Sequence, residues 1–261
     1  MLFVLVPATL LPIYLYSRGM RYKVKNSLAG GWDIISNSWF NATLSLPWNN
    51  IAGDSAQFGG SAGTITIVSP ITVQDLLFTV DNYSLVGSTL TTFSSTMEIN
   101  APTGNTATIN SEISGSGRVD ISGGGVIILG GINTYTGGTT VFNNSTLSVM
   151  TDDNPGAASG FGLTLGNSTT QSILAITGNS FTSAREIKLG GGGIFNLATG
   201  STATLEGVMF SSGSLHLTGA GLLVLMADNT YSGGTTISGG VLKLTQVGGG
   251  AGGSQHRYYR W

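Results

Sequence analysis

Four acidic residues recur at nearly equal spacing along the first half of this chain. They are Asp54, Asp75, Glu98 and Asp120. Their spacing of about 22 residues is close to one coil of a three-sided solenoid, in which aligned side chains of successive strands lie about 4.8 Å apart. Carboxylates at that distance repel one another unless a cation binds between them, their pKa values rise or the side chains splay outward. The chemistry such a row would support is calcium binding or acid catalysis on a polysaccharide, and we keep it as an alternative.

Other catalytic constellations cannot be assembled from the residue types present. The chain has two histidines and no cysteine, which removes thiolate catalysis and sulfur-ligated metal. His216 alternates with Leu215 and Leu217, so we expect it to face outward from a strand. The glycine-rich stretches neither open a helix nor carry the lysine of a phosphate-binding loop. We therefore assign no catalytic residue, no cofactor and no metal ligand, and we expect that the chain is not an enzyme.

The composition argues against a nucleic-acid partner. Charged residues make up 8% of the 261 residues, where about 25% is usual for soluble domains. Six of the ten basic residues lie at the two ends, so residues 26–255 hold twelve acids and four bases, a balance of about −8. A base-poor body gains no affinity from counterion release along a phosphate backbone.

Short runs of β-branched and aliphatic residues fill the chain from about residue 64. TITIV at 64–68, LLFTV at 76–80 and VIIL at 126–129 are examples, separated by Gly, Asn and Ser. The centres of these runs lie roughly 7–14 residues apart, and no stretch of ten residues shows a helical apolar period. We predict an all-β fold.

One unit of the sequence occurs twice. ISGGGVIILGGINTYTGGTTVF at 121–142 aligns without gaps on LTGAGLLVLMADNTYSGGTTIS at 217–238, with ten identities. Within it, NTYTGGTT at 133–140 returns as NTYSGGTT at 229–236. Recurrence of such a unit indicates a repeat architecture, in which each unit buries its apolar face against its neighbours.

We interpret the shared octapeptide as a structural corner of the coil. Its asparagine bonds nearby backbone and tolerates left-handed angles, and its tyrosine covers the open side of the turn while the hydroxyl stays in water. The two glycines permit positive φ or close backbone approach. The corner residues are Asn133, Tyr135, Gly137 and Gly138 in the first copy, and Asn229, Tyr231, Gly233 and Gly234 in the second.

The wider pattern GxGxLxLxGxNTYTGGTTxxxGTLxV resembles the autotransporter-associated β-strand repeat of exported bacterial surface proteins, although Asn144 and Ser145 replace the usual glycine. The segments GGWDIISNSW and WNNIAGDSAQFG, with Trp32, Trp39 and Trp48, resemble the opening of such passengers. The resemblance implies a right-handed, single-stranded parallel β-helix that is secreted and displayed at the bacterial cell surface. It also implies an outer-membrane barrel elsewhere in the full-length protein. The implied function is structural or adhesive, with glycans, extracellular matrix or sister chains as partners.

We divide the chain into three parts. Residues 1–26 are an apolar and then basic segment, either a signal-anchor remnant or an artefact of the start site. Residues 27–246 are the β-helix, with repeats at 121–149 and 217–245, and residues 247–261 are a glycine-rich linker and tail. We expect the tryptophan-containing region to cap the N-terminal end and the C-terminal end of this fragment to be uncapped. Two alternatives remain: a carbohydrate-active β-helix enzyme (a polysaccharide lyase or hydrolase), and a carbohydrate-binding β module built as a sandwich of antiparallel strands.

Overall fold

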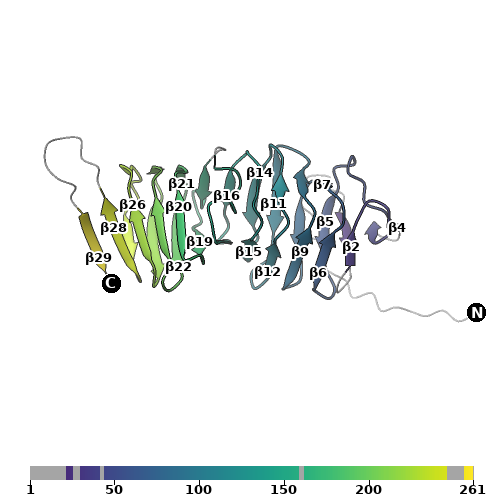
Figure 1. Ribbon diagram of the computed structural model, residues 1–261, viewed down its shortest axis with the longest axis horizontal. Coiled ribbons are helices and arrows are strands. Elements are labelled where there is room, and N and C mark those ends of the chain that lie inside the picture. The colour runs from purple at the N-terminus through teal and green to yellow at the C-terminus, as the bar shows by residue number, and fades with distance from the viewer. Residues whose placement is uncertain (1–21, 26–29, 42–43, 159–161, 246–255, 261) are drawn as a thin grey trace, which may run out of the picture.

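The protein is a solenoid of stacked β-strands (Figure 1). The computed structural model describes residues 22–25, 30–41, 44–158, 162–245 and 256–260. The regular elements of these residues are all strands, and among them no helix is long and apolar enough to cross a membrane. Of the N-terminal segment expected at residues 1–26, residues 1–21 and 26 lie outside the described residues. Residues 22–25 form a strand that pairs in parallel with residues 55–58 of the solenoid, so this sheet begins earlier than the expected boundary at residue 27. The prediction of an all-β, parallel solenoid is confirmed.

Each coil places its strands on three faces, which we name A, B and C. Face A is the 11-stranded sheet, with strands β1 (Tyr22–Lys25), β3 (Trp39–Asn41), β4 (Leu44–Leu46), β5 (Ser55–Phe58), β8 (Leu76–Phe78), β11 (Thr96–Asn100), β14 (Arg118–Ser122), β16 (Thr139–Val141), β18 (Leu163–Leu165), β21 (Ile187–Leu189) and β24 (Met209–Phe210). Face B is the 10-stranded sheet, with strands β2 (Gly30–Trp32), β6 (Thr64–Ile67), β9 (Tyr83–Gly87), β12 (Thr106–Ile109), β15 (Val126–Leu129), β17 (Thr146–Val149), β19 (Ser172–Ile176), β22 (Gly192–Leu197), β25 (Ser214–Gly219) and β27 (Thr235–Ile237).

Face C consists of two shorter sheets. The first holds β7 (Ile71–Val73), β10 (Leu90–Thr92) and β13 (Ile113–Ser114), and the second holds β20 (Ser180–Ser183), β23 (Thr202–Leu205), β26 (Leu222–Leu225), β28 (Val241–Thr245) and β29 (His256–Arg260). Strand pairs between coils are parallel, and the antiparallel strand pairs among the described residues lie at the two ends of the stack. This pairing excludes the antiparallel sandwich.

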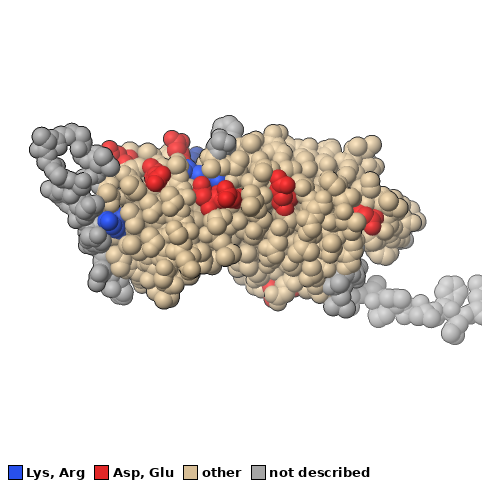
Figure 2. All heavy atoms as spheres, viewed as in Figure 1, with Lys and Arg blue, Asp and Glu red and all other residues tan. Residues whose placement is uncertain are grey.

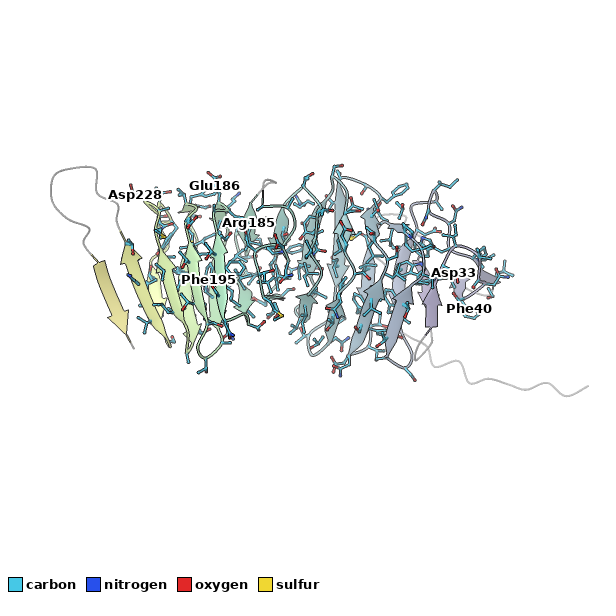
Figure 3. All side chains as sticks on the ribbon, viewed as in Figure 1. Asp33, Phe40, Arg185, Glu186, Phe195 and Asp228 are labelled. Atoms are coloured by element: carbon cyan, nitrogen blue, oxygen red, sulfur yellow. The ribbon has the colours of Figure 1, made fainter. Side chains whose placement is uncertain are left out.

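Alternating side chains build the core. Inward residues of successive coils lie in register, so aliphatic groups stack on aliphatic groups along the axis. One such row on face B is fully buried and consists of Ile65, Leu85, Ile109, Leu129, Val149, Ile176 and Leu197. Figure 3 shows Phe195 pointing into the same interior from β22, while Glu186 and Asp228 lie at the outer edge. Burial of each Leu or Ile contributes about 1.5–3 kcal/mol.

The coils differ in length, as the pairing along face B shows. Among the coils that follow β6, the longest runs from Ser148 to its partner Ala175 and contains the loop at residues 150–158. This loop lies on face C, where residues 132–135 and 151–157 take the place of strands between β13 and β20. The equivalent face-B positions, paired one after another, are Thr64, Ser84, Thr108, Ile128, Ser148, Ala175, Asn196 and Thr218.

Aromatic side chains close the N-terminal end. Trp32, Trp39 and Trp48 are buried, and their ring centroids lie 4.8–4.9 Å apart. Phe58 continues the cluster into the core, 5.7 Å from Trp32 and from Trp39. The antiparallel strands β3 and β4 lie at the same end of face A. The tryptophan region therefore covers the first coil, as expected.

The expectation of an uncapped C-terminal end was wrong for face C only, because β24 and β27 are the last described strands of faces A and B. Strand β29, which lies within the expected glycine-rich tail, pairs antiparallel with β28 over five residues. The physical reason is that the last strand of a parallel stack presents a row of unpaired N–H and C=O groups, which any nearby segment of chain can satisfy.

The two copies of the repeat lie on different faces. The apolar strand of the first copy is β15 on face B, whereas that of the second copy is β26 on face C. Over four coils of face B, the pairing leads from Val126 to His216. The repeat alignment instead matches Val126 with Leu222, six positions further along the chain. The distance between the two copies therefore exceeds a whole number of coils by six residues. This excess shifts the apolar strand of the second copy from face B to face C.

Candidate functional site

The first repeat corner is held by its asparagine. The Asn133 side chain is buried, and its Oδ1 accepts a hydrogen bond from the backbone N–H of Ile113 at 2.7 Å. Its Nδ2 donates to the carbonyl of Asn154 in the next coil. Asn154 in turn donates from Nδ2 to the carbonyl of Gly131. One amide side chain thus joins three successive coils at a place where face C has no strand.

The second corner repeats this geometry with less burial. Asn229 Oδ1 accepts from the backbone N–H of Met209 at 2.7 Å, again from the preceding coil. Its Nδ2 donates to the carbonyl of Ala227 within its own turn, whereas Asn133 Nδ2 donates to the following coil. The same residue type therefore makes the same bond on two different faces, A and C.

The two tyrosines differ in their surroundings. Tyr135 Oη lies 2.7 Å from Thr139 Oγ1, and the ring is fully buried. Tyr231 Oη makes the equivalent bond to Thr235 at 2.6 Å, but this bond is exposed and the ring is only partly buried. The expectation that the hydroxyl of Tyr135 stays in water was wrong, because the loop at residues 150–158 folds over the ring and Gly156 packs against it. Burial raises the pKa of Tyr135 well above its usual range.

The paired glycines of the corners have separate roles. A Cβ on Gly137 would collide with the backbone N of Arg118, and one on Gly233 would collide with the carbonyl carbon of Gly213. Gly138 and Gly234 have φ values of 80° and 81°. The first glycine thus permits close approach of two coils, and the second permits the left-handed turn.

Three of the four spaced carboxylates lie side by side on face A. Glu98 pairs in register with Asp120, and the register of β8 with β11 puts Asp75 next to Glu98. Asp54 is one position out of the row, because Ser55 is the residue opposite Asp75. Residues paired between β5 and β8 are 20 positions apart in the sequence, whereas Asp54 and Asp75 are 21 positions apart.

Each carboxylate of the row has its own hydrogen-bond donors. Asp75 accepts from the backbone N–H of Glu98 at 2.8 Å and from Ser55 Oγ at 3.0 Å. Burial raises the pKa of Asp75, and the neighbouring Glu98 raises it further. Glu98 itself accepts from Ser122 Oγ. Asp120 accepts from Arg118 at both oxygens, 2.6 and 2.7 Å. Among the described residues, no three acidic or histidine side chains are placed to hold one metal ion.

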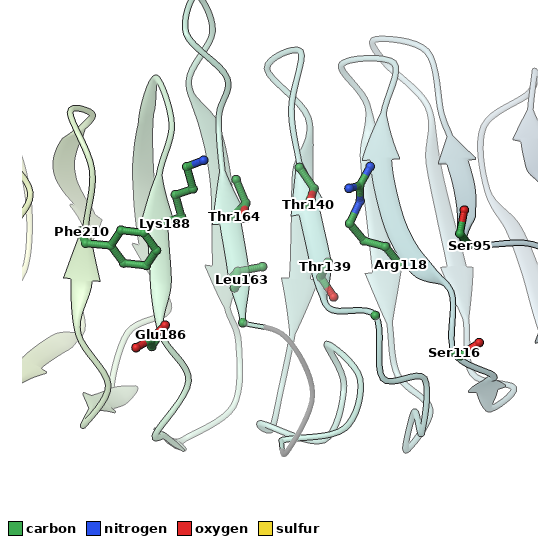
Figure 4. A pocket seen from close by; sticks show the side chains of 12 residues that line it. Ser95, Ser116, Arg118, Thr139, Thr140, Leu163, Thr164, Glu186, Lys188 and Phe210 are labelled. Carbon is green, nitrogen blue, oxygen red and sulfur yellow. The ribbon is translucent and has the colours of Figure 1, made fainter.

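A shallow groove lies on face A directly after this row (Figure 4). The outward positions of five successive strands are Asp120, Thr140, Thr164, Lys188 and Phe210, paired in register. Arg118 and Asp120 of β14 therefore lie at one end, Lys188 and Phe210 lie at the other, and two threonines lie between them. The groove has a volume of about 530 Å³.

The lining of the groove is polar and of mixed charge. Figure 4 shows Arg118 and Lys188 on either side of Thr140 and Thr164, with the ring of Phe210 beyond Lys188. From β14 to β21 the groove spans three coil steps, or about 14 Å. The sequence signal for the groove is weak: Thr140 and Thr164 are small residues on successive strands of face A. Their spacing along the chain does not predict that they are neighbours until the register of the two strands is known.

A buried arginine fixes the long coil, and it carries no recognisable sequence signal. The Arg185 guanidinium donates to Asp152 Oδ1 at 2.7 Å and to the carbonyls of Asp152 and Gly156, each at 2.6 Å. It also donates to the carbonyl of Ala157 at 3.0 Å. In Figure 3 its neighbour Glu186 lies at the surface. The loop at residues 150–158 is therefore clamped to the next coil, as a structural rather than a catalytic feature.

His216 faces outward from β25, as expected, between the buried residues Leu215 and Leu217. Its Nε2 lies 2.7 Å from Ser238 Oγ. The strands on either side offer Ile194 and Thr236 at the paired positions. Neither of these in-register neighbours is a carboxylate that could orient the imidazole ring.

Comparisons with known proteins agree with this architecture. The model of the passenger-associated-transport-repeat family matches residues 122–149 and 215–244, which are the two repeat copies described above. The chain carries passenger repeats of the autotransporter type. Over 239 residues it is 33% identical to the adhesin BmaC autotransporter of Brucella suis biovar 1 (strain 1330), in a match that covers 84% of this chain. The passenger spans 6% of the length of that relative.

No solved structure matches the chain. The repeat family and the relative place the passenger among secreted proteins associated with the outer membrane at the cell surface. The resemblance drawn from NTYTGGTT and its surroundings is confirmed by the family model and by the relative.

Proposed function

We propose that this passenger is a structural and adhesive surface module without enzymatic activity, which contacts extracellular glycan chains through the groove on face A. The groove is the observation that carries the proposal. It runs along the solenoid axis for about 14 Å, which suits an extended polymer better than a compact small molecule. The relative that it resembles is itself named an adhesin.

The lining fits the chemistry of a sugar. Hydroxyl groups of a glycan need both donors and acceptors, and Thr140, Thr164, Glu186 and Lys188 supply both. The half-buried ring of Phe210 offers an apolar face to the C–H side of a sugar ring. Arg118 is already paired with a carboxylate, and Glu186 balances Lys188, so no strong net charge selects for an ionic ligand.

The absence of enzymatic activity is inferred from the carboxylates. A glycosidase needs one carboxylic acid that can give a proton and a second carboxylate free to act on the sugar. Both oxygens of Asp120 are occupied by Arg118. Asp75 is buried, with each oxygen accepting a hydrogen bond. Asp120 is thus held as the partner of a guanidinium and Asp75 is held inside the fold, which supports a structural role for both carboxylates.

The test is binding of the purified chain to a glycan array and to immobilised extracellular matrix. The variant Thr140→Lys with Thr164→Lys fills the groove and should lose at least tenfold in affinity. The matched control, Val126→Lys with Thr146→Lys, makes the same change in net charge on face B and should bind like the parent. Equal binding by both variants, or no binding by the parent, would sink the proposal.

The enzymatic alternative has a separate test. The chain should release no new reducing or unsaturated ends from any glycan that it binds. Release that disappears in Asp120→Asn while binding persists would overturn the non-enzymatic part of the proposal and leave the groove in place.

A further inference from the structure

The first repeat corner is covered by a turn of the following coil. The backbone N–H of Asn133 donates to the carbonyl of Asp153 at 3.0 Å, and its side chain donates to the carbonyl of Asn154. Thr139 Oγ1 donates to the carbonyl of Pro155 at 3.0 Å. The corner therefore supplies hydrogen-bond donors to three successive carbonyl groups of the turn.

The same turn packs against the tyrosine of the corner. The backbone N–H of Ala157 donates to the carbonyl of Tyr135 at 3.0 Å, and Gly156 contacts the ring. A Cβ on Gly156 would lie 2.6 Å from a ring carbon, and the φ of this glycine is 89°. An Asn-Pro-Gly turn therefore fits the corner because its third residue has no side chain.

The second corner keeps these groups but has no such cover among the described residues. Asn229, Tyr231 and Thr235 are its equivalent residues. Within the described chain, neither the Asn229 backbone N–H nor the Tyr231 carbonyl has a hydrogen-bond partner, and the Thr235 hydroxyl bonds only to Tyr231. A pocket of about 470 Å³ lies between this corner and the ends of β26 and β28. Its volume is within the range of about 300–1,000 Å³ that is usual for ligand pockets.

The segment that follows the second corner does not carry the sequence of the covering turn. The two copies of the corner are 96 positions apart, since residue 133 aligns with residue 229, so Gly250, Ala251 and Gly252 are equivalent to residues 154–156. The side chain of Asn154 shapes the first turn by accepting from the backbone N–H groups at positions 150 and 151. Gly250 has no side chain that could do the same. The sequence that suits the second corner is therefore not present in the chain at the equivalent place.

We propose that the pocket at the second corner binds an Asn-Pro-Gly turn of another protein. The turn supplies carbonyls to the Asn229 N–H and the Thr235 hydroxyl, an N–H to the Tyr231 carbonyl, and a glycine against the tyrosine ring. A second copy of this chain cannot offer its own turn, because Arg185 clamps the loop at residues 150–158 in place. This inference goes beyond the proposed glycan contact and does not depend on the groove on face A.

Charge narrows the choice of partner. Asp228 lines the pocket at the position where the first corner has Ile132. In Figure 3 Asp228 lies at the outer edge of the solenoid, and Figure 2 shows further acidic side chains on that part of the surface. Like charges brought together across an interface are unfavourable. We therefore expect neutral or basic residues before the asparagine of the bound turn, in contrast to the two aspartates that precede Asn154.

The probe for this site is a cyclic peptide of sequence Ser-Ser-Asn-Pro-Gly-Ala, closed by a Gly-Gly linker. The guanidinium of Arg185 contacts both Asp152 and Ala157, so the two ends of the natural turn lie close together and can be joined. A closed ring also loses less conformational entropy on binding. Binding to the full chain, labelled with ¹⁵N, is followed by NMR at the amide signals of Asn229, Tyr231 and Thr235.

The parent should show weak but saturable shifts that are confined to the second corner. Ser232→Trp, at an exposed position that lines the pocket, should weaken binding at least about tenfold by filling it. Thr136→Trp, at the equivalent exposed position of the first corner, should bind like the parent. Circular dichroism checks that both variants are folded, and both positions are exposed, so neither change disturbs the core.

Two altered peptides test the chemistry of the turn. A peptide with alanine in place of the turn glycine should lose saturable binding, because its Cβ would collide with the ring of Tyr231. A peptide with two aspartates before the asparagine should bind at least about tenfold more weakly than the serine peptide. No saturable shifts at the second corner, or equal binding by Ser232→Trp or by either altered peptide, would overturn the inference whatever the glycan result.

Discussion

The two corner asparagines provide a matched test of how burial sets the value of one hydrogen bond. Asn133→Ala removes the acceptor of the Ile113 N–H and the donor to the Asn154 carbonyl, both buried. A buried group left without a partner costs about 1–3 kcal/mol, so the loss should be about 3 kcal/mol. Asn229→Ala removes the equivalent acceptor of the Met209 N–H at a partly buried site. Water can replace part of that bond, so the loss should be about 1 kcal/mol.

The assay is urea unfolding combined with amide exchange. A repeat protein need not unfold as one unit, so exchange at Ile113 and at Met209 reports each corner separately. A global difference of about 2 kcal/mol corresponds to roughly 4–8 °C in melting temperature for a chain of this size. Asn133→Asp serves as the control, because it keeps the acceptor for Ile113 but replaces the donor to Asn154 by an oxygen. It should be at least as unstable as Asn133→Ala at neutral pH.

Equal losses for Asn133→Ala and Asn229→Ala would contradict this account. They would mean that the corner bond has a fixed value set by the octapeptide and that the cover provided by the loop at residues 150–158 adds nothing. A stable Asn133→Asp variant would show that the bond to Asn154 is dispensable.

The remaining predictions concern single contacts of the second corner, the long coil and the carboxylate row. Gly233→Ala should destabilise the second corner more than Gly234→Ala, because a Cβ at Gly233 would collide with the backbone of Gly213. A Cβ at Gly234 has free space around it, so Gly234→Ala should cost only the backbone strain of an alanine at φ near 81°, about 1–2 kcal/mol. Equal melting temperatures of the two variants would contradict this. Arg185→Met should cost about 3–5 kcal/mol by leaving Asp152 without its buried partner and should open the loop at residues 150–158 to proteolysis; an uncleaved loop in the variant would show that the clamp is not what holds it. The raised pKa of Asp75 means that the folded state binds this proton more tightly than the unfolded chain, so its contribution to stability falls as pH rises from about 3.8 through the folded pKa. Asp75→Asn should remove the Asp75 contribution to the pH dependence of unfolding, measured in urea between about pH 3 and pH 7. At pH values above this range the variant should be at least as stable as the parent. An unchanged pH profile would show that Asp75 does not titrate as inferred.

Much of the fold can be predicted from short stretches of the chain. Alternation in TITIV and TLSV identifies strands, because only a pleated backbone puts every second side chain into a core. NTYTGGTT identifies a corner, because its asparagine and glycines have backbone chemistry that acts within a few residues. The recurrence of this unit indicates a stack of repeats and connects the chain to exported passengers.

The surfaces that carry the two proposals depend on distances along the chain that no local pattern contains. The unequal lengths of the coils decide which outward residues become neighbours. They put Asp54 out of the carboxylate row, place Thr140 beside Thr164 and send the second repeat to another face. They also bring Arg185 onto a loop of an earlier coil and bury Tyr135 beneath it.

Strands, corners and the kind of fold can thus be read from the chain alone, since they follow from the conformational preferences of each residue and its near neighbours. Which side chains share a face becomes known only when the coils are stacked, because pairing between coils depends on the summed lengths of all the turns between them. The groove on face A and the open pocket at the second corner are products of that sum.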